Sequence, residues 1–245
     1  SGVWVQVGSD IDGEAAGDQS GYSVSLSSDG SRVAIGAYGN DGTASNAGHV
    51  RIYKDSSGVW VQVGSDIDGE AAGDRSGYSV SLSSDGSRVA IGAIYGTASR
   101  AGHVRIYKDS SGVWVQVGLD IDGEAAGDRS GYSVSLSSDG SRVAIGAIYG
   151  TASRAGHVRI YKDSSGVWVQ VGLDIDGEAA GDRSGYSVSL SSDGSRVAIG
   201  AIYGTASRAG HVRIYKDSSG VWVQVGLDID GEAASDYSGY SVSLS

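Results

Sequence analysis

One loop of the sequence carries a dense set of acidic side chains. Asp66, Asp68, Glu70 and Asp74 stand close together in it, and Gly69 follows the second of them. Calcium takes roughly six to eight oxygen ligands, and an Asp-x-Asp-Gly pattern supplies two carboxylates beside a sharp turn. The loop is therefore a candidate calcium site, although it lacks the third ligand and the fixed bidentate glutamate of an EF-hand loop.

The same acidic loop occurs five times along the chain. The candidate calcium ligands are Asp10, Asp12 and Asp18; Asp66, Asp68 and Asp74; Asp120, Asp122 and Asp128; Asp174, Asp176 and Asp182; and Asp228, Asp230 and Asp236. If the copies fold alike, these carboxylates should gather on one face of the molecule.

A simpler interpretation of the acidic loops needs no metal. Aspartate side chains commonly cap their own turns, and Ile67 and its equivalents would then fill the core while the glutamates are solvated. Arg75 directly follows the loop, and Arg100 is expected on the same face, so these cations and their equivalents would neutralise part of the charge. Turn capping is the preferred interpretation because it is far commoner than metal binding.

Other candidate chemistry is sparse. Histidine recurs once per copy, at His49, His103, His157 and His211, where it opens a strand and is interpreted as a packed or rim residue. The chain has no cysteine, no Gly-x-Ser-x-Gly motif and no serine with a reproducibly spaced His–carboxylate pair. We therefore predict no catalytic residue and expect that the protein is not an enzyme.

Aromatic residues give a second candidate binding site. Trp60, Trp114 and Trp168 recur at a fixed position, and exposed aromatic rings can stack on sugar rings. Because Trp114 alternates with Val113 and Val115, packing between neighbouring repeats is the alternative interpretation.

The candidate residues belong to a tandem repeat, whose strands must hold them in place. Tryptophans at positions 4, 60, 114, 168 and 222 are separated by 56 residues once and by 54 three times. The units span approximately 22–77, 78–131, 132–185 and 186–239, with partial strands in 1–21 and 240–245, so residues 1–245 form one repeat array. Near-identity of the later copies indicates recent duplication or design, and the chain is interpreted as a slice of a longer array.

Each unit contains four strand patterns. In the second unit they cover 78–82, 88–93, 103–108 and 113–117, and Asp85-Gly86 marks the first hairpin turn. No segment has helical periodicity. The pattern predicts an all-β β-propeller of four-stranded antiparallel blades, each of ~54 residues, with an open β-solenoid as the rival architecture. Four blades are complete, and the ring could close as four blades or as five with one defective.

The repeats resemble the FG-GAP repeats of integrin α-type β-propellers and their secreted relatives. Gly73 to Val80 is similar to the family's Phe-Gly segment, Ala90 to Ala93 to its Gly-Ala-Pro segment, and Gly102 to Tyr107 to the strand that follows. Ser76 stands where the family has Phe. The short turn of residues 83–87 stands where the family has its calcium loop. The resemblance implies a propeller with an extracellular or cell-surface role in adhesion, without calcium in the usual family position.

The net charge and the lengths of the apolar runs limit the classes of partner that the protein could bind. A net charge of −11 argues against nucleic acid, and no apolar run reaches the length of a membrane span. The leading hypothesis is a non-catalytic extracellular structural or adhesive module, whose partners are itself, through end-to-end or oligomeric assembly, or other extracellular proteins and glycans. The alternatives are a multivalent glycan-binding propeller that gains strength through avidity, and an engineered symmetric protein without a natural task.

Overall fold

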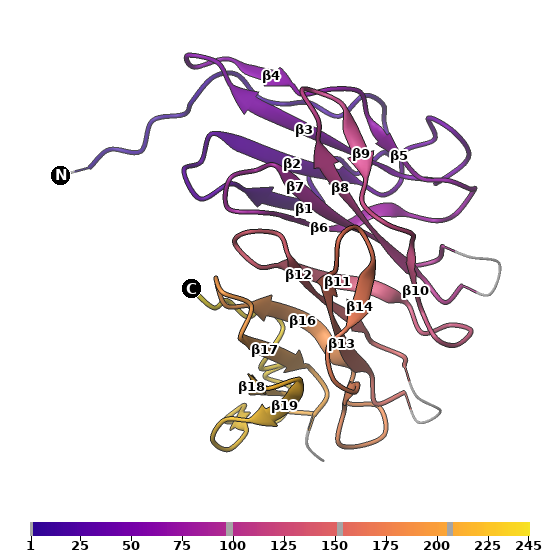
Figure 1. Ribbon diagram of the computed structural model, residues 1–245, viewed down its shortest axis with the longest axis vertical. Helices are drawn as coiled ribbons and strands as arrows, with labels where there is room; N and C mark the ends of the chain where they lie inside the picture. The colour runs from indigo at the N-terminus through magenta and orange to yellow at the C-terminus, as the bar shows by residue number, and fades with distance from the viewer. Residues whose placement is uncertain (1, 97–99, 151–153, 205–207) are drawn as a thin grey trace.

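The architecture is a row of four antiparallel β-sheets (Figure 1). The computed structural model describes residues 2–96, 100–150, 154–204 and 208–245. No helix occurs among these residues, and hence none that could cross a membrane. The all-β fold and the repeated four-stranded unit are therefore confirmed.

The strands of each sheet follow one another in chain order. The first sheet contains β1 (Ser23–Leu26), β2 (Arg32–Ala37), β3 (His49–Asp55), β4 (Trp60–Gln62) and β5 (Ile67–Asp68). The second contains β6 (Ser76–Leu82), β7 (Arg88–Ala93), β8 (His103–Asp109), β9 (Trp114–Gln116) and β10 (Ile121–Asp122). The third contains β11 (Ser130–Leu136), β12 (Arg142–Ala147), β13 (His157–Asp163), β14 (Trp168–Gln170) and β15 (Ile175–Asp176). The fourth contains β16 (Ser184–Leu190), β17 (Arg196–Ala201), β18 (His211–Ser218), β19 (Val221–Gln224) and β20 (Ile229–Asp230).

The last two strands of each sheet are two halves of one interrupted strand. β9 pairs with the end of β8, where Tyr107 is opposite Gln116, and β10 pairs with its start, where His103 is opposite Asp122. Each unit is therefore a four-strand meander whose outer strand breaks where the acidic loop begins.

The antiparallel meander gives every sheet two distinct ends. The tight turns after β6 and β8 lie at one end, called the turn rim. The loop after β7 and the acidic connection after β10 lie at the other end, called the loop rim. The same arrangement recurs in all four sheets, so equivalent loops share one side of the molecule.

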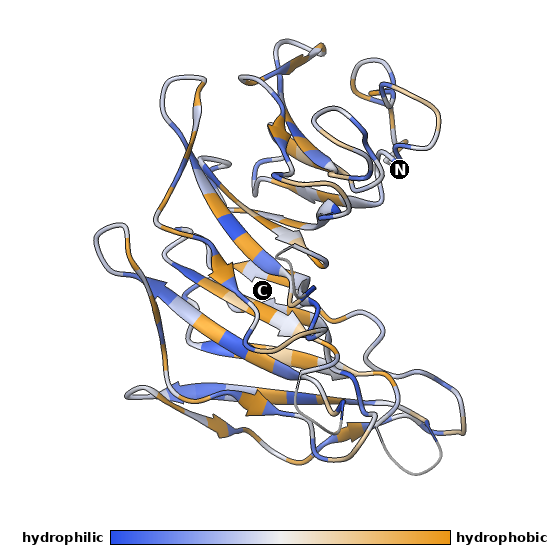
Figure 2. Ribbon diagram, turned by 90° about the vertical axis from the view of Figure 1, so that its right-hand side faces the viewer, coloured by the Kyte–Doolittle hydropathy of each residue, from blue (hydrophilic) through white to orange (hydrophobic). Residues whose placement is uncertain are grey.

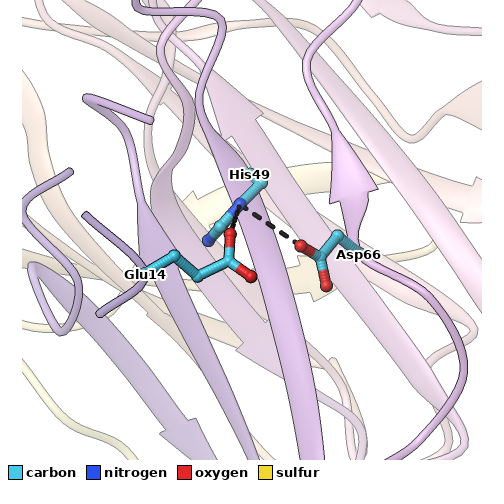
Figure 3. Close-up of side chains that lie close together, drawn as sticks. All are labelled: Glu14, His49 and Asp66. Atoms are coloured by element: carbon cyan, nitrogen blue, oxygen red, sulfur yellow. Dashed lines mark ion pairs between the residues drawn. The ribbon is translucent and has the colours of Figure 1, made fainter. Parts of the chain in front are cut away.

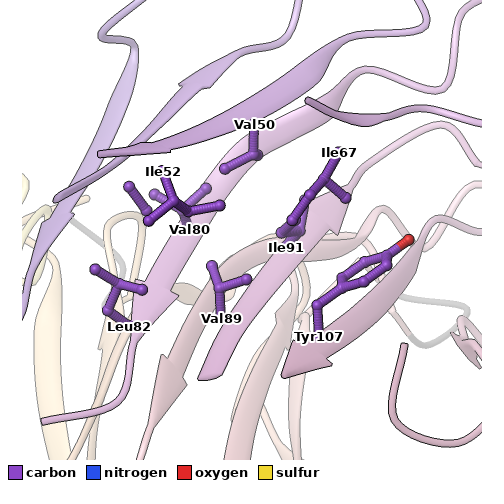
Figure 4. Close-up of a cluster of buried hydrophobic side chains, with 9 residues drawn as sticks. Val50, Ile52, Ile67, Val80, Leu82, Val89, Ile91 and Tyr107 are labelled. Carbon is purple, nitrogen blue, oxygen red and sulfur yellow. The ribbon is translucent and has the colours of Figure 1, made fainter. Parts of the chain in front are cut away.

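Unequal sheet faces hold the row together, and hydrophobic and hydrophilic residues alternate along the strands that form them (Figure 2). One face of each sheet carries large apolar side chains on its first three strands. The other face carries Ala, Gly and Ser on the first two strands, and Val and Ile on the third and last strands. Between the first two sheets the buried cluster consists of Ala34, Val50, Ile52 and Ile67 from one side and Val80, Leu82, Val89, Ile91 and Tyr107 from the other (Figure 4). Equivalent clusters fill the next two junctions.

Ion pairs reinforce the junctions near the turn rim. Arg32 donates to Asp109 of the next sheet at 2.9 Å, and the Arg88–Asp163 and Arg142–Asp217 pairs repeat the contact at 2.8 Å. Burial opposes ionisation of Asp109, but the hydrogen bonds from Arg32 and from the Gly112 N–H outweigh it, and its pKa lies below the usual value.

Tyrosines line the inner edge, where the sheets come closest. Ring centroids of Tyr22, Tyr78, Tyr132, Tyr186 and Tyr240 lie 4.9–5.1 Å apart in sequence order, with 47–49° between successive ring planes. Burial raises the pKa of the Tyr78 and Tyr132 hydroxyls above the usual value, so these two side chains are uncharged at neutral pH.

The predicted partial strands in 1–21 and 240–245 are wrong, because no strand forms in 2–22 or in 240–245. Each segment lacks the adjacent strand with which its equivalents pair. Both still lie on a neighbouring unit: Trp60 donates to the Val7 carbonyl at 2.9 Å, and the Leu244 N–H donates to Ser189 Oγ at 2.9 Å.

The junction packing gives a stability prediction with an internal control. Leu82 is 7% exposed inside the first junction, while Leu26, its equivalent in the first sheet, is 61% exposed. We expect Leu82→Ala to lower the free energy of unfolding by about 2–5 kcal/mol. Leu26→Ala should change it by less than about 0.5 kcal/mol. Urea unfolding followed by tryptophan fluorescence measures both, and equal losses would contradict the junction packing.

Candidate functional site

The loop rim collects most of the ionisable side chains that the sequence singled out. Its loops cover residues 69–75, 123–129 and 177–183, together with the described parts of the loops after β7, β12 and β17. Arg75 and Arg100 both lie beside the Tyr95 ring, so the two kinds of loop meet at the same end as expected.

The third aspartate of each acidic loop caps its own turn. Asp74 is buried and accepts hydrogen bonds from the N–H groups of Ala71 at 2.8 Å and Glu70 at 3.1 Å. Equivalent carboxylates do the same, and they are Asp18, Asp128, Asp182 and Asp236. These side chains hold the loop in shape, as the capping interpretation proposed.

A Glu–His–Asp group forms at each of the four described sheets, with its glutamate on the acidic loop that precedes the sheet. In the first, His49 Nδ1 lies 3.8 Å from Glu14 and 3.6 Å from Asp66, and the carboxylates approach the ring from two loops (Figure 3). The equivalent groups are Glu70, His103 and Asp120; Glu124, His157 and Asp174; and Glu178, His211 and Asp228. Possible ligand atoms within each group lie within 4.8 Å of one another.

This grouping differs from the predicted calcium set. Of the candidate ligands, it includes the first aspartate of an acidic loop, as in Asp66, but neither Asp68 nor Asp74. The sequence could not show the grouping, because the glutamate precedes its sheet, the histidine opens the third strand, and the aspartate lies in the break of the outer strand. One signal in the sequence was available: His103 and Arg105 stand two residues apart on β8. Such residues share a face of a strand, so their side chains should lie near each other.

A buried arginine already neutralises each glutamate. Arg105 lies 3.4 Å from Glu70, donates to the Asp68 carbonyl at 2.8 Å and has its guanidinium 5.7 Å from the centre of the Tyr107 ring. Burial, and then the charge of Arg105, lower the pKa of His103. The donor set thus offers nitrogen and oxygen ligands, but a fixed cation competes with any metal for the glutamate.

The first aspartate of each acidic loop is hydrogen-bonded as well, to a glutamine side chain four residues before it. Asp66 accepts from the Gln62 side-chain amide at 2.6 Å, and Asp120 accepts from Gln116 at 2.7 Å. Together with the caps, these bonds occupy most of the predicted calcium ligands within the protein itself.

A second set of arginines stacks on tyrosines along the rim. Arg129 lies 5.1 Å from the centre of the Tyr95 ring and 4.6 Å from that of Tyr149, so one guanidinium bridges two units. Arg75 bridges Tyr38 and Tyr95, and Arg183 bridges Tyr149 and Tyr203. Arg100, Arg154 and Arg208 each add a second guanidinium, 5.7–5.8 Å from the tyrosine of the same unit. We call these six arginines and their tyrosines the Arg–Tyr ladder.

Grooves open beside the ladder at the three junctions, with volumes of about 1130, 690 and 630 Å³. The second groove is lined by Tyr95, Arg100, Arg129, Tyr149 and Arg154, together with the small residues of an acidic loop. The first also contains Glu70, His103 and Asp120. Each groove therefore combines cationic and aromatic side chains with exposed backbone.

The predicted tryptophan sites lie away from this rim. Trp114 and Trp168 are half-buried against the junction cores, and their indole N–H groups donate to Val63 and Val117 of the preceding unit at 2.9 Å. Trp60 and Trp114 line smaller grooves of about 310 Å³. Binding of sugars by Trp60, Trp114 or Trp168 stays a prediction.

Comparison with known proteins supports the repeat and the fold. Residues 10–53 match the family model of the FG-GAP repeat, which confirms the resemblance over these residues. No curated protein matches the sequence.

Similar solved structures are lactonases by name. A candidate 6-phosphogluconolactonase of Bacteroides uniformis ATCC 8492 is 13% identical, with a TM-score of 0.59 over 87% of this chain and 55% of its own. A second, of Bacteroides fragilis NCTC 9343, is 15% identical, with a TM-score of 0.59 over 86% and 55%. The periplasmic gluconolactonase of Pseudomonas aeruginosa is 16% identical, with a TM-score of 0.59 over 85% and 56%. The chain spans about half the length of these proteins, and at this identity the likeness concerns the fold, which is a β-propeller.

The expectation that the protein is not an enzyme is overturned by these structures, because the proteins that share its fold are named as lactonases. The expectation rested on missing serine and cysteine motifs. A propeller can instead bring residues of different units together, and the Glu–His–Asp groups show that spacing along the chain does not reveal such contacts.

The donor sets give a prediction about metal. We expect EDTA to leave the melting temperature unchanged, because Glu70 and its equivalents pair with buried arginines and the aspartates are hydrogen-bonded within the protein. Calorimetry with and without chelator measures this. A lower melting temperature that calcium restores, and that Asp120→Asn and its equivalents abolish, would instead establish calcium in these loops.

Proposed function

We propose that this propeller, built from FG-GAP-type repeats, binds carbohydrate at the loop rim, with an equivalent groove at each junction between units. The observation that carries the proposal is the recurrence of that groove with the same tyrosine and arginine lining. An extracellular or cell-surface setting and a role in adhesion belong to the same proposal.

The grooves have the size and chemistry for sugars. Ligand sites commonly enclose roughly 300–1,000 Å³ and combine a few oriented polar groups with apolar walls. Guanidinium N–H groups of Arg100 and Arg129 can donate to hydroxyl and carboxylate oxygens, and exposed Ala126 and Gly127 let a ligand approach the backbone. The names of the similar structures, which refer to gluconolactone, support the ligand class.

Repetition makes weak grooves useful. Three equivalent sites on one rigid row let a polymeric ligand bind several units at once, which raises the apparent affinity without any new contact. A monosaccharide should therefore bind much more weakly than a chain of the same sugar.

Blocking the grooves tests the proposal. We expect the triple variant Ala72→Trp, Ala126→Trp and Ala180→Trp, which fills the three grooves, to weaken glycan binding by at least about tenfold. The matched control places three tryptophans on the turn rim by Ser56→Trp, Ser110→Trp and Ser164→Trp, and should bind as the parent does. Glycan-array binding followed by titration calorimetry measures both. Equal binding by the two variants, or no glycan bound by the parent, would reject the proposal.

Lactone hydrolysis is a second candidate, favoured because Glu70, His103 and Asp120 line the same groove as Arg75 and Arg100. A histidine beside carboxylates can take a proton from water, and guanidinium groups can stabilise the oxyanion that forms when water attacks a lactone carbonyl.

Acid release from glucono-δ-lactone, followed with a pH indicator, tests this second candidate. We expect release faster than in buffer, and a loss of at least about 10²-fold when His49, His103, His157 and His211, the proposed proton acceptors, are all replaced by Gln. Lys54→Gln, Lys108→Gln and Lys162→Gln on the exposed ends of the third strands serve as a control. A rate equal to that of buffer would reject hydrolysis.

A further inference from the structure

We infer that the Arg–Tyr ladder is a binding surface for acidic polysaccharide, a polymer whose carboxylate or sulfate groups pair with successive arginines. This inference rests on the proposed function, because it names the class of carbohydrate that the loop rim would bind.

All but one of the arginines of this chain fall into two classes, the exception being Arg196 at the exposed start of β17. Those within the junctions are paired with carboxylates, as in Arg105 with Glu70 and Arg88 with Asp163. The six ladder arginines have no carboxylate oxygen within 4.0 Å in the part of the chain that the structure describes, and their contacts are with tyrosine rings. A row of guanidiniums without counter-charges is a site for anions.

The second and third grooves carry a local excess of positive charge, whereas the first also contains Glu70, Asp120 and Asp122. The second contains Arg100, Arg129 and Arg154 with a single acid, Asp128, whose carboxylate caps its own loop. The third repeats this composition with Arg154, Arg183, Arg208 and Asp182. Although the chain has a net charge of −11, the ladder is locally cationic, and the acidic remainder of the molecule confines an anionic polymer to it.

Backbone requirements do not explain the ladder arginines. Arg75, Arg129 and Arg183 have φ of 56–59°, and Arg100, Arg154 and Arg208 have φ of 56–57°. This left-handed region suits Gly and Asn better than a long side chain. The first unit shows that other residues fit, since Gln19 and Asn46 occupy the two positions with φ of 55° and 51°. The conformation therefore does not require arginine, and the cation needs another reason.

The stacking geometry indicates which anion fits. Tyr95 has Arg75, Arg100 and Arg129 within 5.8 Å of its centroid, so three guanidiniums gather at one ring. Planar guanidinium edges match carboxylate and sulfate groups in a two-point contact. Single-stranded nucleic acid is disfavoured, because its bases stack on free aromatic faces.

The ladder is continuous across units. Each of Arg75, Arg129 and Arg183 lies over tyrosines of two successive units, so cationic groups recur without interruption from Tyr38 to Tyr203. Such a track fits an extended polymer with one charge on each sugar better than an isolated sugar acid.

Two polymers with one backbone test the inference: polygalacturonate, and the same polymer with its carboxylates methyl-esterified. We expect polygalacturonate to bind at least about tenfold more tightly, and its affinity to fall as salt rises, because exposed charges are screened. In Arg100→Asn, Arg154→Asn and Arg208→Asn, which copy Asn46, the affinity for polygalacturonate should fall by at least about tenfold. Arg75→Gln, Arg129→Gln and Arg183→Gln, which copy Gln19, should have the same effect, and unchanged melting temperatures would show that both variants fold.

The control removes three positive charges elsewhere through Lys54→Gln, Lys108→Gln and Lys162→Gln, and should bind as the parent does. If both polymers bind equally and the arginine variants keep the affinity, the inference fails while carbohydrate binding stands. If no glycan binds the parent, the proposed function fails as well. If polyphosphate or oligothymidylate binds as tightly as polygalacturonate, with the same dependence on the ladder arginines, the preference for acidic sugar is refuted.

Discussion

The rest of the structure depends on the close approach of one sheet's first two strands, which present Ala, Gly and Ser on this side, to the large apolar face of the next sheet. Gly92 shows how close the backbones come, because a Cβ at this position would lie 2.1 Å from the Gly131 carbonyl oxygen. Gly36, Gly146 and Gly200 meet the same constraint at 2.0–2.2 Å. A single methyl group at any of these positions would force neighbouring sheets apart, and with them the tyrosine column and every contact across the loop rim.

The same approach determines what the loop rim can hold. Because the sheets are so close, Arg105 reaches across its junction to the carbonyl of Asp68, and Arg129 reaches tyrosines of two units. The buried arginines neutralise the glutamates and tie the junctions. The rim arginines stack on tyrosine rings and have no carboxylate partner among the described residues, so their charge is available to a ligand. Each junction thus contains two kinds of arginine: buried ones that stabilise the packing of the sheets, and ladder arginines that a ligand could reach.

Much of the fold could be predicted from single residues. The alternation in residues 78–82, the Asp85-Gly86 turn and the Ala and Gly on one face of 88–93 specify strands, turn and close packing, and the structure has all three. The caps formed by Asp74 and its equivalents were also predictable, because aspartate bonds to nearby backbone in any such turn. These features depend on neighbours in sequence.

The site was less predictable because its contacts join units. Glu70, His103 and Asp120 meet only when two sheets stack, and Arg129 stacks on Tyr95 of the preceding unit. No spacing within one repeat contains that information. For the same reason the missing motifs were poor evidence against catalysis, and the end segments failed as strands once their pairing partners were absent.

The tyrosine column also limits how many units can share one circle. A rotation that carries one ring onto the next is at least as large as the 47° between their planes, so a full turn of 360° holds seven steps at most. Two copies of this four-sheet protein have eight sheets in total, which is more than one closed ring with this step can contain. Copies joined end to end with the same rotation would therefore form an open helix instead of a closed ring. The Arg–Tyr ladder would follow that helix from copy to copy.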